Sequence, residues 1–280
     1  MSAPNNAEPV VDTRASWDVA TRNHNRHKGD QAAFFNAGGD VLFPEELELL
    51  GPIEGRSLVH LQCNAGQDSL CLARRGAQIT GVDFSSEAVR FARELAEATR
   101  LEATFVEAEL CDWMQTTEAR FELAFSSYGA VGWMPELDRW TSGVRRILRP
   151  GGRFVLVEFH PLIWSFDAAA GLTRDDYFQR GPFIEPVGDY VADSGASLGA
   201  VTEAPRGDNP IPAASFQYGL AETVQALVKA GLQLERLVEW PYANGCKHPA
   251  LVAAEGRRWV WPPGVARVPL MFGLSVRAPS

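Results

Sequence analysis

The chain of 280 residues has few cysteines and no long apolar run, and these two absences narrow the class of protein. A disulfide-rich secreted scaffold or a C-x-x-C motif is excluded by the number and spacing of Cys63, Cys71, Cys111 and Cys246. No stretch approaches the roughly 20 apolar residues that span a bilayer. The first ten residues, MSAPNNAEPV, lack the charged and apolar regions of a signal peptide. We therefore expect a cytoplasmic protein with reduced thiols and no membrane partner.

Basic residues are also scarce relative to acidic ones. The chain has 26 Lys and Arg against 35 Asp and Glu, which gives a net charge of −9, and its adjacent arginines are scattered. A phosphate backbone is bound by clustered positive charge, so a nucleic-acid partner is disfavoured. His24 and His27 have no second Cys or His pair with matching spacing, whereas structural zinc needs three or four such ligands. We expect no metal site and a small-molecule partner; the sequence leaves the oligomeric state open.

What the chain does contain is an alternation of strands and helices. Residues 57 to 160 alternate apolar runs with amphipathic segments, which is typical of a parallel sheet covered on both faces. Residues 161 to 218 are rich in Gly, Pro and Asp and are too long for an ordinary connection. We expect an N-terminal extension and cap over residues 1–50, and a single domain over residues 51–280 that contains a lid or cap insertion at about 161–218.

The most informative segment is SLVHLQCNAGQDSLCLARRGAQITGVDF, residues 57 to 84. It predicts a buried strand, a tight turn that ends at Gly66, a helix that begins near Asp68, and a second strand that ends at Asp83. A helix N-terminus offers free N–H groups to a ligand. An acid at the end of the second strand, about 20 residues after the turn, can accept hydrogen bonds from ribose hydroxyls. The other interpretation of Asp83 is a simple helix cap.

The glycine pattern of the turn bears on which nucleotide it binds. In the dinucleotide fingerprint G-x-G-x-x-G the glycines allow the backbone to approach a pyrophosphate, but Gln62 and Asn64 hold the first two positions here. This argues against NAD and FAD.

The turn and the segments after it resemble the class I methyltransferases that bind S-adenosylmethionine. His60-Leu61-Gln62-Cys63, Gly66, Asp68 and Ser69 match the H-L-Q-C-x-x-G-x-D-S variant of the first motif found in a small-molecule branch of that family. Residues 105–112 (FVEAELCD), 121–129 (FELAFSSYG), 149–152 (RPGG) and 154–161 (FVLVEFHP) are similar to its later motifs, and residues 268–277 are similar to its last strand. The resemblance covers most of the chain from Leu47 onward.

The resemblance implies an α/β fold with a Rossmann-like seven-stranded sheet, mostly parallel with the last strand antiparallel, and helices on both faces. It implies S-adenosylmethionine as the cofactor and S-adenosylhomocysteine as its product. The cofactor-binding residues that it implies are Gln62, Cys63, Asn64, Gly66, Asp68, Asp83, Phe84, Glu109, Leu110, Ser126 and Ser127.

Three side chains are candidates for the acceptor side of the reaction. His160 follows the fifth strand, where an imidazole near neutral pH can remove a proton from a hydroxyl or ammonium group; the alternative is that it only shapes the turn. Tyr128 follows two serines at a strand end, which favours a place in the pocket. His24 belongs to the polar cluster from residue 22 to residue 31, which either closes over the cofactor or is a solvated segment. His60, between apolar residues, is expected to be a buried histidine with a hydrogen-bond partner.

We expect a methyltransferase that acts on N or O of a small, partly aromatic metabolite. Methyl transfer needs the nucleophile held in line with the methyl group and, where required, removal of its proton. Two other classes stay open: a non-catalytic protein that binds an adenosyl ligand, and a nicotinamide-dependent oxidoreductase, which would need glycine in place of Gln62 and Asn64.

Overall fold

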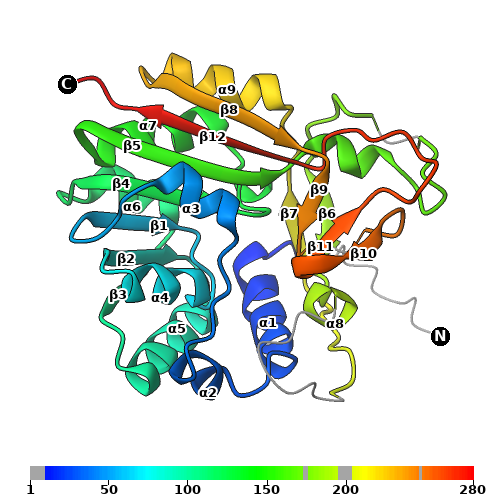
Figure 1. Ribbon diagram of the computed structural model, residues 1–280, viewed down its shortest axis with the longest axis horizontal. Helices are drawn as coiled ribbons and strands as arrows, with labels where there is room; N and C mark the ends of the chain where they lie inside the picture. Colours follow the sequence, from blue (N-terminus) through cyan, green and yellow to red (C-terminus); the bar gives the residue numbers. More distant parts are fainter. Residues whose placement is uncertain (1–9, 173–175, 195–203, 246–247) are drawn as a thin grey trace, which may run out of the picture.

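A seven-stranded sheet forms the centre of the computed structural model, which describes residues 10–172, 176–194, 204–245 and 248–280. Cys246 lies outside these ranges. Five neighbouring strands pair parallel with one another. A sixth strand lies at one edge, and the seventh runs antiparallel between this edge strand and the parallel five (Figure 1). In spatial order they are β3 (Ala103–Glu107), β2 (Gln78–Asp83), β1 (Ser57–Leu61), β4 (Phe121–Ser127), β5 (Leu148–Phe159), β12 (Met271–Arg277) and β8 (Gln233–Trp240).

Helices cover both faces of the sheet and enclose two apolar cores. One face carries α2 (Gln31–Asn36), α3 (Pro44–Leu50), α4 (Gln67–Arg74) and α5 (Ser86–Thr99). The other carries α6 (Leu110–Thr116), α7 (Leu137–Ile147) and α9 (Leu220–Lys229). The mostly parallel sheet, its antiparallel last strand and the two helical layers confirm the predicted fold class.

Helix α5 shows why these elements form where they do. The Ser85 hydroxyl caps it by accepting a hydrogen bond from the Ala88 N–H at 3.1 Å, an interaction worth about 1 kcal/mol. Ala88, Ala92 and Leu95 lie on one face and are buried against the sheet, as the sequence pattern predicts. The helix ends at Arg100, whose φ of 57° is left-handed.

The strand order reverses between β1 and β4, since the chain runs outward from β1 to β2 and β3 and then returns to β4. In an open α/β sheet a ligand binds in the crevice outside the carboxyl ends of the strands at such a switch point. In Figure 1 this is the edge on the right, where the inserted segments lie.

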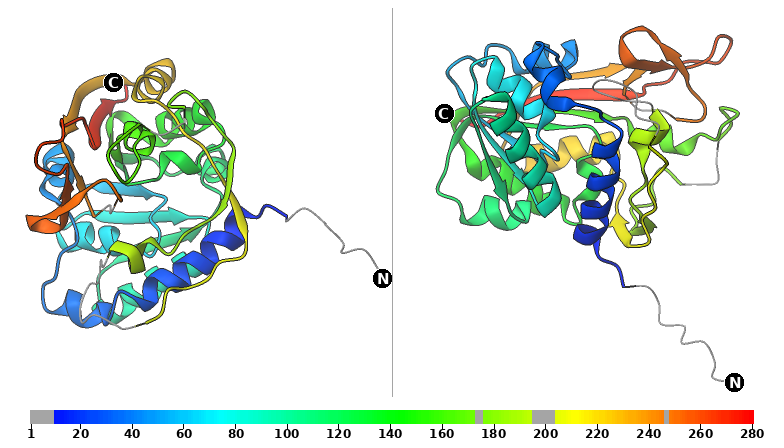
Figure 2. Two further views of the ribbon diagram at one scale, coloured as in Figure 1. Left: turned by 90° about the vertical axis from the view of Figure 1, so that its right-hand side faces the viewer. Right: turned by 90° about the horizontal axis from the view of Figure 1, so that it is seen from below.

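Three groups of elements stand at this edge. The first is helix α1 (Thr13–Arg26). The second lies beside α1 and contains α8 (Tyr190–Ser194) and strand β7 (Pro212–Ser215), which pairs with β6 (Phe183–Pro186) (Figure 2). A third group, which the sequence did not predict, is a small sheet of β9 (Tyr242–Asn244), β11 (Arg258–Val260) and β10 (Val252–Ala254). Short 3-10 turns cover Val131–Trp133, Pro161–Ser165 and Glu255–Arg257.

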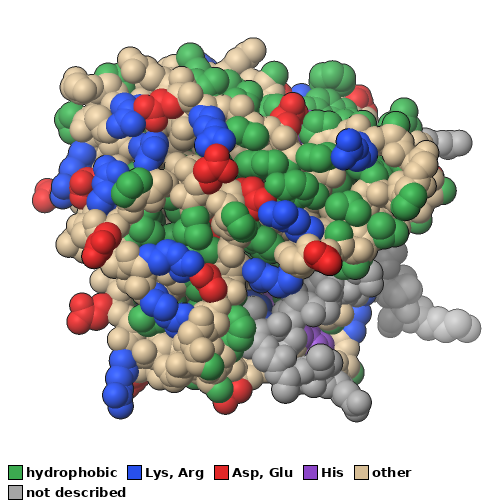
Figure 3. Space-filling model, in the orientation of Figure 1, with side chains coloured by type: hydrophobic (Ala, Val, Ile, Leu, Met, Phe, Trp, Pro, Cys, Tyr) green, Lys and Arg blue, Asp and Glu red, His purple; other side chains and the backbone are tan. Residues whose placement is uncertain are grey.

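The surface facing the reader in Figure 3 has acidic and basic side chains interspersed, without a continuous basic face. Within the described ranges, no helix has the length and apolarity needed to cross a bilayer.

Candidate functional site

The turn after β1 has an unusual backbone. Gln62, Asn64 and Gly66 all have positive φ, at 52°, 47° and 77°. A Cβ at Gly66 would lie 2.8 Å from the Cβ of Ala92, so only glycine lets α4 begin this close to α5. The two non-glycine residues cost roughly 1 kcal/mol or more each in this conformation. The surrounding structure therefore holds the turn in this strained backbone conformation.

Asp83 is fixed against this turn at the carboxyl end of β2. Its carboxylate accepts hydrogen bonds at 2.9 Å from the backbone N–H groups of Asn64 and Ser85, one on each oxygen. Its side chain is 6% exposed, and burial raises its pKa to about 6. The Phe84 N–H interacts with the carboxylate as well, and a carboxylate has about four lone-pair sites, so acceptor capacity remains for the hydroxyls of a diol.

The ends of β1 and β4 carry buried polar atoms that lack partners among the described residues. The Gln62 amide donates to the Ala130 carbonyl at 2.7 Å, but its Oε1 has no partner. The Ser126 Oγ, which is fully buried, has none either. An unsatisfied buried acceptor costs about 1 to 3 kcal/mol. Both residues lie where β1 and β4 end at the switch point, so these atoms are candidate partners for a polar ligand such as the predicted adenosyl cofactor.

The other predicted cofactor residues have varied surroundings. Ser127 Oγ donates to Asp68 at 3.3 Å. Glu109 caps α6 by accepting from the Asp112 N–H at 2.6 Å, which leaves its other oxygen available. Leu110 and Cys63 are buried in the two apolar cores, and Phe84 is half-buried. Their contacts with a cofactor stay predictions.

The polar cluster before residue 31 is packed into the fold. Asn23, His24, Asn25 and His27 are each at most 8% exposed, so the expectation of a solvated segment was wrong for these four. Both histidines have a partner: the His24 Nε2–H donates to the Gly188 carbonyl at 2.9 Å, and His27 Nε2 lies 2.9 Å from Asp189 Oδ2. His24 Nδ1 is buried without a partner among the described residues. Burial lowers the pKa of His24 to about 4, which keeps its imidazole neutral.

Two further contacts tie the front of the chain to the segments that follow β2 and β1. From α1, Asp18 accepts a hydrogen bond at 2.6 Å from the Oγ of Ser85, which follows β2. From α2, Gln31 donates to Asn25 at 2.9 Å and accepts from Gln67, at the start of α4, at 2.6 Å.

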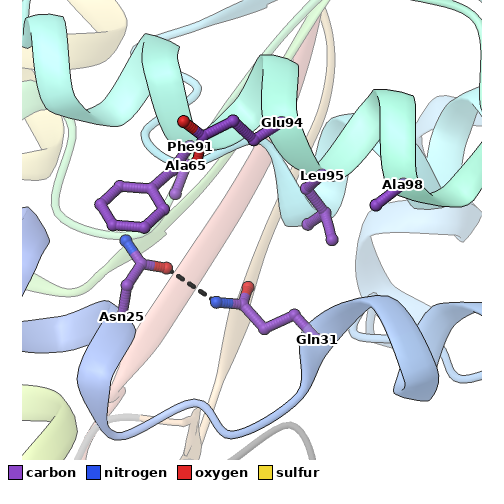
Figure 4. A pocket seen from close by; sticks show the side chains of 7 residues that line it. All are labelled: Asn25, Gln31, Ala65, Phe91, Glu94, Leu95 and Ala98. Carbon is purple, nitrogen blue, oxygen red and sulfur yellow. Dashed lines mark hydrogen bonds between the residues drawn. The ribbon is translucent and has the colours of Figure 1, made fainter.

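Figure 4 shows the Asn25–Gln31 pair on one side of a recess whose other side is formed by α5 residues such as Phe91 and Leu95. The recess has a volume of about 200 Å³. This is below the roughly 300 to 1,000 Å³ of ordinary ligand pockets. It borders the turn after β1 at Ala65.

His160 is 6% exposed and has a partner for each nitrogen. Its Nδ1 accepts from the Leu162 N–H at 3.2 Å, which caps the turn that follows β5, and its Nε2 lies 3.1 Å from Glu239 on β8. Burial lowers its pKa despite the carboxylate. These contacts favour the alternative in which His160 shapes the turn; its role as a base stays a prediction.

His60 is buried as expected, with Nδ1 2.8 Å from Ser69 Oγ.

Sequence reasoning missed a polar network at the end of β4. Tyr128 Oη accepts from Asn244 Nδ2 at 3.1 Å and is hydrogen-bonded to Glu46. Asn244 also donates to Glu45, which accepts from Tyr242 Oη at 2.7 Å. Acids in the first turn of a helix are ordinary, so Pro44-Glu45-Glu46 gave no signal, and Asn244 belongs to the small sheet that was not predicted.

Three kinds of similarity agree with this geometry. Residues 59–152 match the family model of a methyltransferase domain. The chain is 34% identical over 137 residues to an uncharacterised methyltransferase of Synechocystis sp., covering 48% of this chain and 62% of the relative. It is 31% identical over 132 residues to the demethylmenaquinone methyltransferase of Thermus thermophilus, covering 46% and 58%. The chain thus spans about three-fifths of the length of these curated relatives.

The fold has solved counterparts as well. An S-adenosylmethionine-dependent methyltransferase from Mesorhizobium loti superposes with a TM-score of 0.56 at 21% identity, over 86% of this chain and 99% of the other. Residues 59–152 thus form a methyltransferase domain, and the chain as a whole shares the fold of that solved structure.

Proposed function

We propose that the protein transfers a methyl group from S-adenosylmethionine to a nitrogen or oxygen atom of a small, partly aromatic metabolite. The observation that carries the proposal is the buried Asp83 carboxylate, held by the Asn64 and Ser85 amides at the switch point of the sheet. A carboxylate in this place binds the two ribose hydroxyls of an adenosyl ligand.

In this proposal, the residues around Asp83 bind different parts of the cofactor. Gln62 Oε1 and Ser126 Oγ, which are buried and have no partner in the described part of the chain, accept or exchange hydrogen bonds with the ligand. Lys28 and Asp68 attract each other and offer opposite charges to the amino-acid end of the cofactor. Burial lowers the pKa of Lys28 to about 8, so it is still cationic near neutral pH.

When bound, S-adenosylmethionine supplies a methyl group that its positive sulfur has already activated. The protein then has to hold the acceptor in line and take its proton. Tyr128, at the end of β4, is our candidate for the side chain that touches the acceptor. His24 and His160, each with a partner in the protein, act by positioning α1 and the turn after β5.

The acceptor class rests on several observations. The relative from Thermus thermophilus is named for demethylmenaquinone, a partly aromatic small molecule. The net charge of −9 and the interspersed surface charges support a small acceptor over nucleic acid. We also propose that α1 and the segment of residues 161–218 cover the site, since His27 and Asp189 join them.

The test is formation of S-adenosylhomocysteine, followed by mass spectrometry, with panels of small phenols, hydroquinones and amines. We expect product with at least one class, and much slower product formation with Asp83→Asn at the same low concentration of S-adenosylmethionine. Tight cofactor binding with no product from any class would instead favour a non-catalytic adenosyl-binding protein.

A further inference from the structure

The polar network at the end of β4 joins elements that are far apart in sequence. Glu46 comes from α3, Tyr128 directly follows β4, and Asn244 comes from β9. Glu46 is 1% exposed, and its Oε2 accepts from the Phe43 N–H at 3.0 Å. Polar groups are buried at a cost of several kcal/mol unless they are hydrogen-bonded. The bond from Phe43 caps α3 and uses one oxygen of the carboxyl group.

The hydrogen bonds of this network run in a defined direction. The amide of Asn244 donates to Tyr128 Oη at 3.1 Å and to Glu45 at 3.2 Å, which uses both of its N–H groups. Tyr128 Oη accepts this bond, and its O–H donates a hydrogen bond to the carboxylate of Glu46. The tyrosine oxygen keeps one lone pair.

One acceptor atom in the network is left without a partner. Asn244 is 2% exposed, and its Oδ1 has no hydrogen-bond partner in the described structure. Such an atom costs about 1 to 3 kcal/mol unless a donor reaches it. A ligand that carries an N–H or O–H group beside Tyr128 would supply this donor.

The charges around Glu46 make it suited to accept a proton. The titratable groups that face it are Tyr128 from β4, Asp68 from α4 and Glu45 from its own helix. Glu45 is paired with Arg258. Burial, followed by the charge of Asp68, raises the pKa of Glu46 well above its ordinary value.

We propose that Glu46 receives, through Tyr128, the proton that the acceptor loses during methyl transfer, while Asn244 Oδ1 binds an N–H or O–H group of the acceptor. This inference rests on the proposed function and narrows it to neutral or cationic acceptors with such a group. Glu46 is then a positioning residue that acts through Tyr128.

The step balances in atoms and charge. The acceptor's N–H or O–H bond breaks and its bond to the methyl carbon forms, while the sulfur–methyl bond breaks and leaves its electron pair on sulfur. Tyr128 takes the acceptor's proton and gives its own to the ionised Glu46. One positive charge on sulfur and one negative charge on Glu46 disappear together.

The test needs no acceptor. Infrared difference spectroscopy follows the protonated carboxyl group of Glu46 as a function of pH, identified by its loss in Glu46→Gln. Glu48→Gln changes an exposed carboxylate on the same helix, paired with Arg236, and is the matched control. Each titration is made with S-adenosylmethionine and with S-adenosylhomocysteine, and calorimetry measures the binding of both.

We expect a carboxyl group that titrates above the ordinary glutamate range in the native chain and in Glu48→Gln. Its midpoint should fall by about one pH unit or more with S-adenosylmethionine, whose sulfur is positive, and much less with S-adenosylhomocysteine. Tyr128→Phe should raise the midpoint, because the hydroxyl stabilises the ionised carboxylate; this variant keeps the test open if Glu46→Gln does not fold.

Two results would overturn the inference. An equal midpoint with both ligands, or a midpoint in the ordinary range, would show that Glu46 does not face the methyl donor and would leave the proposed function intact. Failure of the folded native chain to bind either ligand would overturn the proposed function, and the inference with it.

Discussion

Asp83 accepts a hydrogen bond on its Oδ2 from the backbone N–H of Asn64 at 2.9 Å. This bond joins the acid that ends β2 to the turn that follows β1. The strained turn and the carboxylate thus hold each other in place before any ligand binds, which lowers the entropy that binding must overcome.

Gly66→Ala should destabilise the fold by about 1 to 3 kcal/mol, because the added Cβ meets Ala92 at 2.8 Å and alanine is strained at a φ of 77°. The measurement is urea unfolding. Gly264→Ala is the control, since its φ of 86° imposes similar strain but no atom lies within 4 Å of its added Cβ. Equal losses in the two variants would show that the contact with α5 is unimportant.

His60 should make the protein less stable in mild acid. Burial lowers its pKa to about 3 in the folded state, against about 6.5 when unfolded. Below pH 6.5 the unfolded chain therefore binds a proton that the folded chain does not, and stability falls by about 1.4 kcal/mol per pH unit between pH 6.5 and 3. Above pH 6.5 the contribution is constant.

Urea unfolding of the native chain and of His60→Gln at pH 7, 6 and 5 measures this contribution. The difference between them should shrink as the pH falls. Asp83, whose pKa is raised to about 6, changes stability in the opposite direction, but it is present in both proteins and cancels in the comparison. A difference that does not vary with pH would contradict the assigned state of His60.

His160→Ala should lose about 1 to 2 kcal/mol of stability, because the Leu162 N–H loses its cap and Glu239 loses its partner. His160→Asn, which can still cap the turn, should recover part of the loss. We expect the affinity for S-adenosylmethionine to stay within about threefold in both variants. A fall in turnover of about 100-fold or more with unchanged stability would restore His160 as the base.

The parts of this fold that follow a regular period could be predicted. Helix α5 shows a clear apolar pattern, and the turn at Gly66 and the acid Asp83 were recognisable from their spacing. Strand β12 was expected from the family resemblance. The small sheet of β9, β11 and β10 could not be, because three-residue strands are too short to show a period.

The polar residues of the site show a second limit. His24 and His27 are buried because residues 188 and 189, more than 160 positions later, supply their partners. Glu46 looked like an ordinary first-turn acid, and only its contact with Tyr128 distinguishes it. Pairings between distant segments leave no local pattern in a single sequence.

The most direct test of the central claim is calorimetric titration of S-adenosylmethionine into the native chain, Asp83→Asn and the surface control Asp112→Asn. Asparagine keeps the shape of Asp83 but removes its charge and one acceptor, and a hydrogen bond to a charged group is worth about 1.5 to 3 kcal/mol. We predict that Asp83→Asn weakens binding by about 10- to 100-fold while Asp112→Asn leaves it unchanged. Equal binding by all three folded proteins would contradict the assignment of this crevice as the cofactor site.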